Sequence, residues 1–125
     1  MDEDIKKKLA NDPDGLATYE ILANNIDSID PMLSDLVDNM IRVDANGQFS
    51  VSAARYLNAI DAQKYDSEIQ RLISAAIDKD RERVYIGSLL SDIWGEDYAD
   101  HAEQLSSTDN NFRRIYKRLY PASII

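Results

Sequence analysis

The stretch from residue 51 to residue 97 decides the fold: VSAARYLNAIDAQKYDSEIQRLISAAIDKDRERVYIGSLLSDIWGED. Apolar residues recur along it at steps of three and four, which is the spacing of one face of an α-helix. Three such faces follow one another, with short polar links at residues 61–66 and 78–83. The faces are Val51, Ala54, Leu57 and Ile60; Ile69, Leu72, Ile73, Ala76 and Ile77; and Val84, Ile86, Leu89, Leu90, Ile93 and Trp94. The stretch therefore predicts three consecutive helices.

The sequence before this stretch continues the helical pattern. Residues 2–10 predict a short first helix whose acids precede its lysines, an order that suits the helix macrodipole. Residues 16–26 carry the next apolar face. Asp30-Pro31 predicts another helix start, with aspartate as the N-cap, and this helix should end before Asp44. Ser50 or Ser52 would cap the helix that follows.

The sequence after residue 94 is also helical in pattern. Gly95 is a natural C-cap, and residues 98–105 predict a shorter, weaker helix. Residues 106–109 offer N-caps for a last helix that ends before Pro121. The chain has no credible run of alternating apolar and polar residues, so we predict an all-α protein of six or seven helices.

Three segments of the chain resemble one another at a period of 33 or 34 residues. The residues that align are Ile26, Ile60 and Ile93, and also Leu22, Tyr56 and Leu89. A period of this length is typical of stacked antiparallel helix pairs. We therefore expect one helical domain over residues 1–125, with a short helix or arm at 1–12 and helix-pair repeats over 13–120. A compact helical bundle is the alternative.

The segments 53–60, 72–80 and 84–93 resemble HEAT-type helical repeats. An Ala/Leu-rich helix ending in isoleucine is followed by a short link, by a helix of the pattern LIxAAIxD, and by a charged turn. The resemblance implies a short, curved α-solenoid that recognises a partner, and it implies no enzymatic activity. The segment 110–121 is similar to segments of small uncharacterised bacterial proteins, which implies no function.

Composition narrows the chemistry that the chain can perform. Its 125 residues include no cysteine and one histidine, His101, which excludes a disulfide framework and cysteine-bound metals. His101 stands four residues after Asp97, but this pair is expected to be a solvated helix start rather than a metal site. No cofactor, no metal and no enzymatic activity are expected, because no phosphate-binding loop, nucleophile motif or zinc motif is found.

Two glycine-containing loops come near the pattern of a calcium-binding EF-hand. With Gly15 or Gly47 as its sixth residue, such a loop would need a bidentate glutamate at its twelfth, where Ile21 or Ala53 stands. Both loops are therefore predicted to be Asx-type turns.

Charge and aromatic residues supply the candidate binding positions. The net charge is −9, yet the last helix carries Arg113, Arg114, Lys117 and Arg118. These bases could bind phosphates or acids, or could neutralise the acidic body and favour the negative helix end. Tyr65, Tyr98 and Tyr120 lie near links or ends and are the tyrosines expected to be exposed for partner binding.

These observations favour a non-enzymatic interaction or scaffold module that binds a basic or amphipathic protein segment. The alternative is a nucleic-acid-associated protein that uses the basic last helix, although an acidic body makes nucleic acid an unlikely partner. A metal-dependent enzyme and an acidic imitation of nucleic acid are further alternatives. The N-terminus lacks a signal-peptide pattern and no apolar run could span a bilayer, so a cytoplasmic protein without membrane contact is expected.

Overall fold

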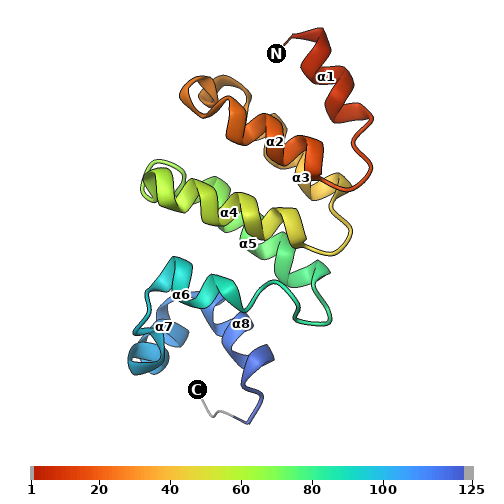
Figure 1. Ribbon diagram of the computed structural model, residues 1–125. Helices are drawn as coiled ribbons and strands as arrows, with labels where there is room; N and C mark the ends of the chain where they lie inside the picture. The colour runs from red at the N-terminus through yellow and green to blue at the C-terminus, as the bar shows by residue number, and fades with distance from the viewer. Residues whose placement is uncertain (1, 123–125) are drawn as a thin grey trace.

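The computed structural model describes residues 2–122 of the chain (Figure 1). This part of the chain forms α-helices and three short 3-10 segments and contains no strand, so the all-α prediction is confirmed. The expected domain also includes residue 1 and residues 123–125, which lie outside the described residues. The helices are α1 (Glu3–Ala10), α2 (Leu16–Asn24), α3 (Leu33–Val43), α4 (Gln48–Asp61), α5 (Asp66–Lys79), α6 (Ser88–Trp94), α7 (Ala102–Thr108) and α8 (Asn110–Leu119); the 3-10 segments are η1 (Ile26–Ser28), η2 (Asp30–Met32) and η3 (Tyr98–His101).

Several helix ends form where the sequence predicts them. The side chain of Asp2 accepts the amide of Ile5 at 2.8 Å and so caps α1, whose first turn is acidic and whose last turn is basic. Asp109 caps α8 in the same way, through the amide of Phe112 at 3.1 Å. Gly95 ends α6, and its amide donates to the carbonyl of Ser91.

Three other expected boundaries are wrong. Asp30 does not cap α3: it opens the 3-10 segment η2, and its carboxylate accepts from Lys64 at 2.9 Å and from the Tyr65 hydroxyl at 3.3 Å. Neither serine caps α4, because that helix already begins at residue 48, directly after Gly47. Residues 84–86 are not helical, because a carboxylate described below takes up their amides.

The helices pack in two layers. Helices α2, α4 and α6 follow one another in one layer, and α3, α5 and α8 follow one another in the other. Consecutive helices α2 and α3, and α4 and α5, run antiparallel across the layers, while α1 packs on α2 and α3 and α7 packs on α8 (Figure 1). The core lies between the layers, where Leu36, Leu57, Leu72 and Leu89 are completely buried.

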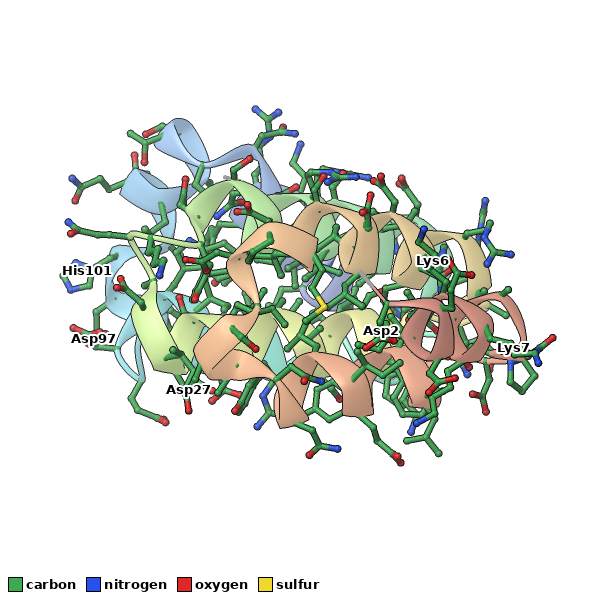
Figure 2. All side chains as sticks on the ribbon, turned by 90° about the horizontal axis from the view of Figure 1, so that it is seen from above. Asp2, Lys6, Lys7, Asp27, Asp97 and His101 are labelled. Atoms are coloured by element: carbon green, nitrogen blue, oxygen red, sulfur yellow. The ribbon has the colours of Figure 1, made fainter. Side chains whose placement is uncertain are left out.

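Two edges of this arrangement carry the connections. The link edge comprises residues 25–32, 61–66 and 95–101, which connect α2 to α3, α4 to α5 and α6 to α7. The loop edge comprises residues 11–15, 44–47 and 80–87, which connect α1 to α2, α3 to α4 and α5 to α6. Figure 2 looks along the stack: Asp27 and Asp97 lie at one end of the molecule, and Lys6 and Lys7 lie at the other.

Candidate functional site

A buried aspartate organises each of the three connections at the loop edge. Asp12, Asp44 and Asp80 are 5%, 1% and 2% exposed. In each case one carboxylate oxygen accepts the backbone amide of the sixth residue further on, at 2.8 Å. We call residues 12–18, 44–50 and 80–86 the aspartate loops. An ionised carboxylate that accepts several amides in this way satisfies donors that would otherwise be left without partners at a helix start.

The first two aspartate loops share their sequence pattern and their bonds. In each loop the aspartate also accepts the amides of its second and third followers, which confirms the predicted Asx-type turns. The third follower is Gly15 in one loop and Gly47 in the other, and both have a left-handed backbone. In the first loop the Thr18 hydroxyl adds a bond to the aspartate at 2.6 Å, whereas the Ser50 hydroxyl in the second makes none with the described residues.

In the third aspartate loop the aspartate also accepts backbone amides, although the loop sequence is different. Asp80 accepts the amides of Val84, Tyr85 and Ile86 at 3.0, 2.7 and 2.8 Å. Its third follower is Arg83, the one described non-glycine residue with a positive φ, at 61°. A left-handed backbone therefore occurs at the same place in all three loops, and here it is adopted without a glycine.

The helix before each loop is also tied to a later helix: α1 to α3, α3 to α5 and α5 to α8. The carbonyl three residues before each aspartate accepts a side-chain donor from that later helix. The pairs are Asn39 to Leu9, Lys79 to Ile41 and Arg118 to Ile77. These contacts join successive helices close to each loop, while the aspartates themselves accept bonds from within their own loops, which gives them a structural role.

Counting from the buried aspartates gives a register that differs from the expected alignment of the three segments. Counted from the aspartates, the tenth followers are Leu22, Ala54 and Leu90, all at most 1% exposed. The expected alignment instead matched Ile60 with Ile26 and Ile93, and the Ile60 side chain is 49% exposed. The isoleucine alignment and the aspartate register therefore differ by two residues between the first segment and the second.

The pKa of Asp12 makes stability depend on pH. Burial alone would raise this pKa, but the hydrogen bonds from Thr18, Gly15 and Asp14 together lower it below 3.8. The carboxylate therefore contributes stability above pH 3.8, and this contribution is lost as the pH falls through the lower pKa of the folded state. We expect the free energy of unfolding of wild type to fall more steeply below pH 4 than that of Asp12→Asn. Equal slopes in urea titrations at pH 7, 4 and 3 would contradict this.

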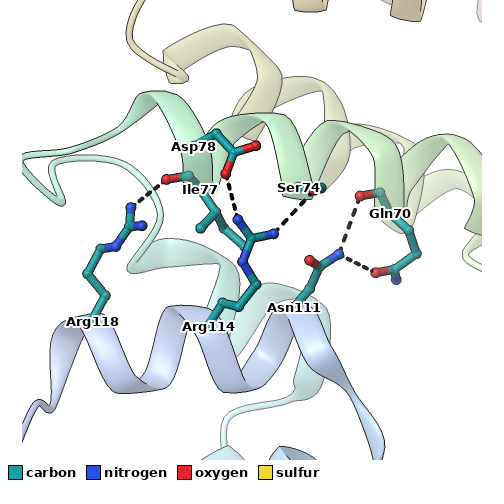
Figure 3. A network of polar contacts seen from close by, with 7 residues as sticks. All are labelled: Gln70, Ser74, Ile77, Asp78, Asn111, Arg114 and Arg118. Carbon is teal, nitrogen blue, oxygen red and sulfur yellow. Dashed lines mark hydrogen bonds and ion pairs between the residues drawn. The ribbon is translucent and has the colours of Figure 1, made fainter.

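The four bases of α8 do not form one free surface. Figure 3 shows two of them, Arg114 and Arg118, directed at α5. Arg114 donates to the Asp78 carboxylate at 2.6 Å and to the Ser74 hydroxyl at 3.2 Å, both on α5. Arg118 reaches the carbonyl of Ile77. The other two bases, Arg113 and Lys117, are exposed. Arg113 donates to Asn110 within its own helix, and Lys117 forms no ion pair with the described residues. Two of the four bases therefore hold α8 against α5.

This division predicts stability effects of different size for two bases of α8. Arg114→Ala removes an ion pair and a hydrogen bond at a half-buried position, and should lower the free energy of unfolding by about 1 kcal/mol. Lys117→Ala, a matched loss of one charge on the same helix, should change it by less than about 0.5 kcal/mol. Chemical denaturation of both variants measures the difference, and equal effects would contradict the division.

The three candidate tyrosines differ in exposure. The expected exposure of Tyr65 is wrong: it is 4% exposed, because its ring packs into the core and only its hydroxyl reaches Asp30. Tyr98 is half-buried, Tyr120 is 43% exposed, and their hydroxyls lie 3.2 Å apart. This contact raises the pKa of Tyr98, and Tyr120 also packs against Tyr116 at a ring distance of 4.9 Å.

The Asp97 and His101 pair forms as the sequence predicts. The two side chains lie 3.1 Å apart, both are exposed, and Figure 2 shows them at the link edge. No group of three or more potential metal-ligating side chains is found within residues 2–122.

The link edge carries an excess of exposed acids. Its three links hold seven exposed carboxylates, and one lysine, Lys64, which is paired with Asp30 at 2.9 Å. The acids are Asp27, Asp30, Asp61, Asp66, Glu96, Asp97 and Asp100. The hydrogen bond from Lys64 is the main reason that the pKa of Asp30 is lowered.

An open groove of about 620 Å³ lies at this edge, between the α4–α5 link and α6. Ala62, Ile69, Ile93 and Trp94 supply its apolar lining, and Asp66 is among its polar residues. We call it the link-edge groove. A second open hollow of about 450 Å³ lies across α2, α4 and α6, contains Tyr19 and Tyr56, and shares Asn58 with the groove.

The groove residues were not among the candidates from sequence. Trp94 was expected to pack in the core; it does contact the Phe112 ring, at 5.3 Å, but it is only partly buried and also lines the groove. Its indole donates to Asp109 at 2.8 Å, which fixes the ring. The available signal was a single tryptophan directly followed by Gly95, Glu96 and Asp97.

No protein-family model, curated protein or solved structure matches the chain. Among the described helices, none combines the length and the apolar character that crossing a bilayer requires.

Proposed function

We propose that the protein is a non-enzymatic interaction module, a short HEAT-like α-solenoid that binds a protein partner through its surface. Its units would be the pairs α2 with α3, α4 with α5, and α6 with α8, with α1 before them and α7 inserted into the last. The order of helices within each layer supports a row of pairs over a bundle around one centre. The three aspartate loops support it independently, because each follows a helix that is hydrogen-bonded to a later helix.

One observation carries the proposal: the link-edge groove and the hollow beside it adjoin at Asn58 and extend over α2, α4, α5 and α6. Both are open, and both place aromatic side chains beside polar ones. Partially exposed aromatic side chains in such surroundings are typical anchors of protein interfaces. A surface that spans successive helix pairs is also what stacked-pair proteins use to bind partners.

Affinity capture tests this function directly. The immobilised chain is incubated with extract of the source cell at 150 mM salt after nuclease treatment, and the retained protein is purified and bound again. We expect one protein to bind with defined stoichiometry. Retention that is lost with nuclease would favour the nucleic-acid alternative instead, and failure of every purified candidate to bind would contradict the proposal.

Surface variants then show which part of the module is used. Ala62→Arg blocks the link-edge groove, while Tyr120→Ala and Lys117→Ala alter the exposed end of α8. All three positions are exposed, so the fold should tolerate the changes. Loss of the purified partner with one variant alone locates the interface, whereas unchanged binding by all three would contradict a surface at either place.

A further inference from the structure

We propose that the link-edge groove binds a basic amphipathic segment of the partner protein. This inference deepens the proposed function and rests on it. The apolar face of the segment would lie on Ile93, Trp94 and Ala62, and its basic face would lie against the exposed carboxylates of the link edge.

The groove has an apolar part, whose tryptophan is held in place, beside polar lining residues. Trp94 is fixed from two sides, by the hydrogen bond to Asp109 and by the edge-to-face contact with Phe112. Ile69 at the base is 2% exposed, and Ile93 beside it is half-buried. A pre-organised aromatic ring next to aliphatic side chains loses little conformational entropy when a partner covers it.

The negative charge around the groove favours a positively charged partner segment. Asp66 lines the groove, Asp61 directly precedes the lining residue Ala62, and Glu96 stands two residues after Trp94. All three carboxylates are exposed, and the nearby Lys64 is already engaged by Asp30. Such a set of like charges attracts a basic segment over roughly a Debye length, about 8 Å at physiological salt, and repels phosphate backbones.

A second copy of this chain fits less well than a separate partner. Its basic helix α8 has two bases engaged with α5. Its lysine-rich helix α1 already buries Leu9 and half-buries Ile5 in its own fold. Neither helix has a free apolar face to place on Trp94, so the groove is assigned to a different protein.

The test uses a synthetic probe and the protein's one tryptophan. The probe is a helix of about 18 residues, or five turns, with lysines on one face and leucines on the other and without tryptophan. A scrambled peptide of the same composition is its control. Because Trp94 is the sole tryptophan, its emission and its indole NMR signal report the groove directly. We expect both signals to shift when the amphipathic probe is added. The affinity obtained from these shifts should be at least tenfold lower for the scrambled peptide.

Matched variants locate the binding. Ala62→Arg should lower the affinity for the probe at least tenfold. Ala10→Arg, the same change at an exposed position on α1, should leave the affinity unchanged. Asp66→Asn should weaken it about two- to fivefold at low salt, and Asp35→Asn on α3 should leave it unchanged. Urea unfolding of each variant checks that the fold is intact.

Three results would overturn the inference. If the scrambled peptide bound as well as the amphipathic probe, or if Ala62→Arg bound the probe fully, the binding would be a general attraction between opposite charges and not recognition by the groove. An unresponsive Trp94 would place any binding elsewhere. If the captured native partner still binds when the probe does not, the groove assignment fails and the interaction function stands; if neither binds, both fail.

Discussion

Replacing Asp80 by alanine should lower the free energy of unfolding by about 3–5 kcal/mol, one of the two largest effects that we expect. Asp80 is 2% exposed, and its loss leaves the amides of Val84, Tyr85 and Ile86 without their acceptor. The bond to Ile86 is buried and the other two are part-buried. Each buried donor left unpaired costs about 1–3 kcal/mol, reduced where water can enter. Urea unfolding at neutral pH measures the change.

Two further substitutions make this result specific. Asp80→Asn keeps one acceptor oxygen and should cost less than Asp80→Ala. Asp35→Ala removes an exposed aspartate from the first turn of α3 and should cost well under 1 kcal/mol. If Asp80→Ala were as mild as Asp35→Ala, the buried carboxylate would not be organising its loop.

The second large effect is expected for Gly47→Ala, at about 2–4 kcal/mol. Gly47 has φ of 87°, where an L side chain costs about 1–2 kcal/mol. An added Cβ would also lie 3.2 Å from the carbonyl oxygen and 3.3 Å from the Cα of Ala76 on the next helix of the layer. These are backbone atoms, so relief requires two helix pairs to move apart.

Gly87→Ala is the matched control. Gly87 has an ordinary right-handed backbone, and an added Cβ would meet only the end of the Leu119 side chain, at 3.4 Å. This variant should be neutral or stabilising by up to about 1 kcal/mol, because alanine restricts the unfolded chain. Thermal unfolding of both variants should separate them by more than 10 °C; similar melting temperatures would show that Gly47 is not a contact between pairs.

Local patterns were sufficient to predict the fold class. The spacing of Ile69, Leu72, Ile73, Ala76 and Ile77 depends on one helix alone, and all five side chains are buried as expected. The caps at Asp2, Gly95 and Asp109 are also local, because each bond joins residues three or four apart. Such features can be read from sequence without knowledge of the tertiary structure.

The features that were missed depend on residues far apart in the chain. Arg114 and Arg118 meet partners 36 and 41 residues away, so helix spacing alone placed all four bases of α8 together. Tyr65 was expected at the surface because it lies in a link, yet the 3-10 segment η2 brings Asp30 to its hydroxyl. The expected helix at residues 84–86 failed because the Asp80 carboxylate takes up its first amides.

The pattern that the first two aspartate loops share can be seen in the sequence. DPDGLAT at residues 12–18 and DANGQFS at residues 44–50 share one pattern, and both were interpreted only as turns. The third loop does not show this sequence pattern, because Arg83 adopts the left-handed backbone that glycine has in the other two loops. The backbone requirement is shared by the three loops, while the residue that meets it is not.

Amide hydrogen exchange tests most directly the claim that three successive helix pairs repeat one loop design. Thr18, Ser50 and Ile86 lie at or before helix starts, where amides lack intrahelical partners and ordinarily exchange fast. The account predicts that all three are strongly protected, and that Asp80→Ala removes the protection of Ile86 while Thr18 and Ser50 keep theirs. Exchange of these three amides as fast as that of exposed Asp4 at the start of α1 would contradict the account.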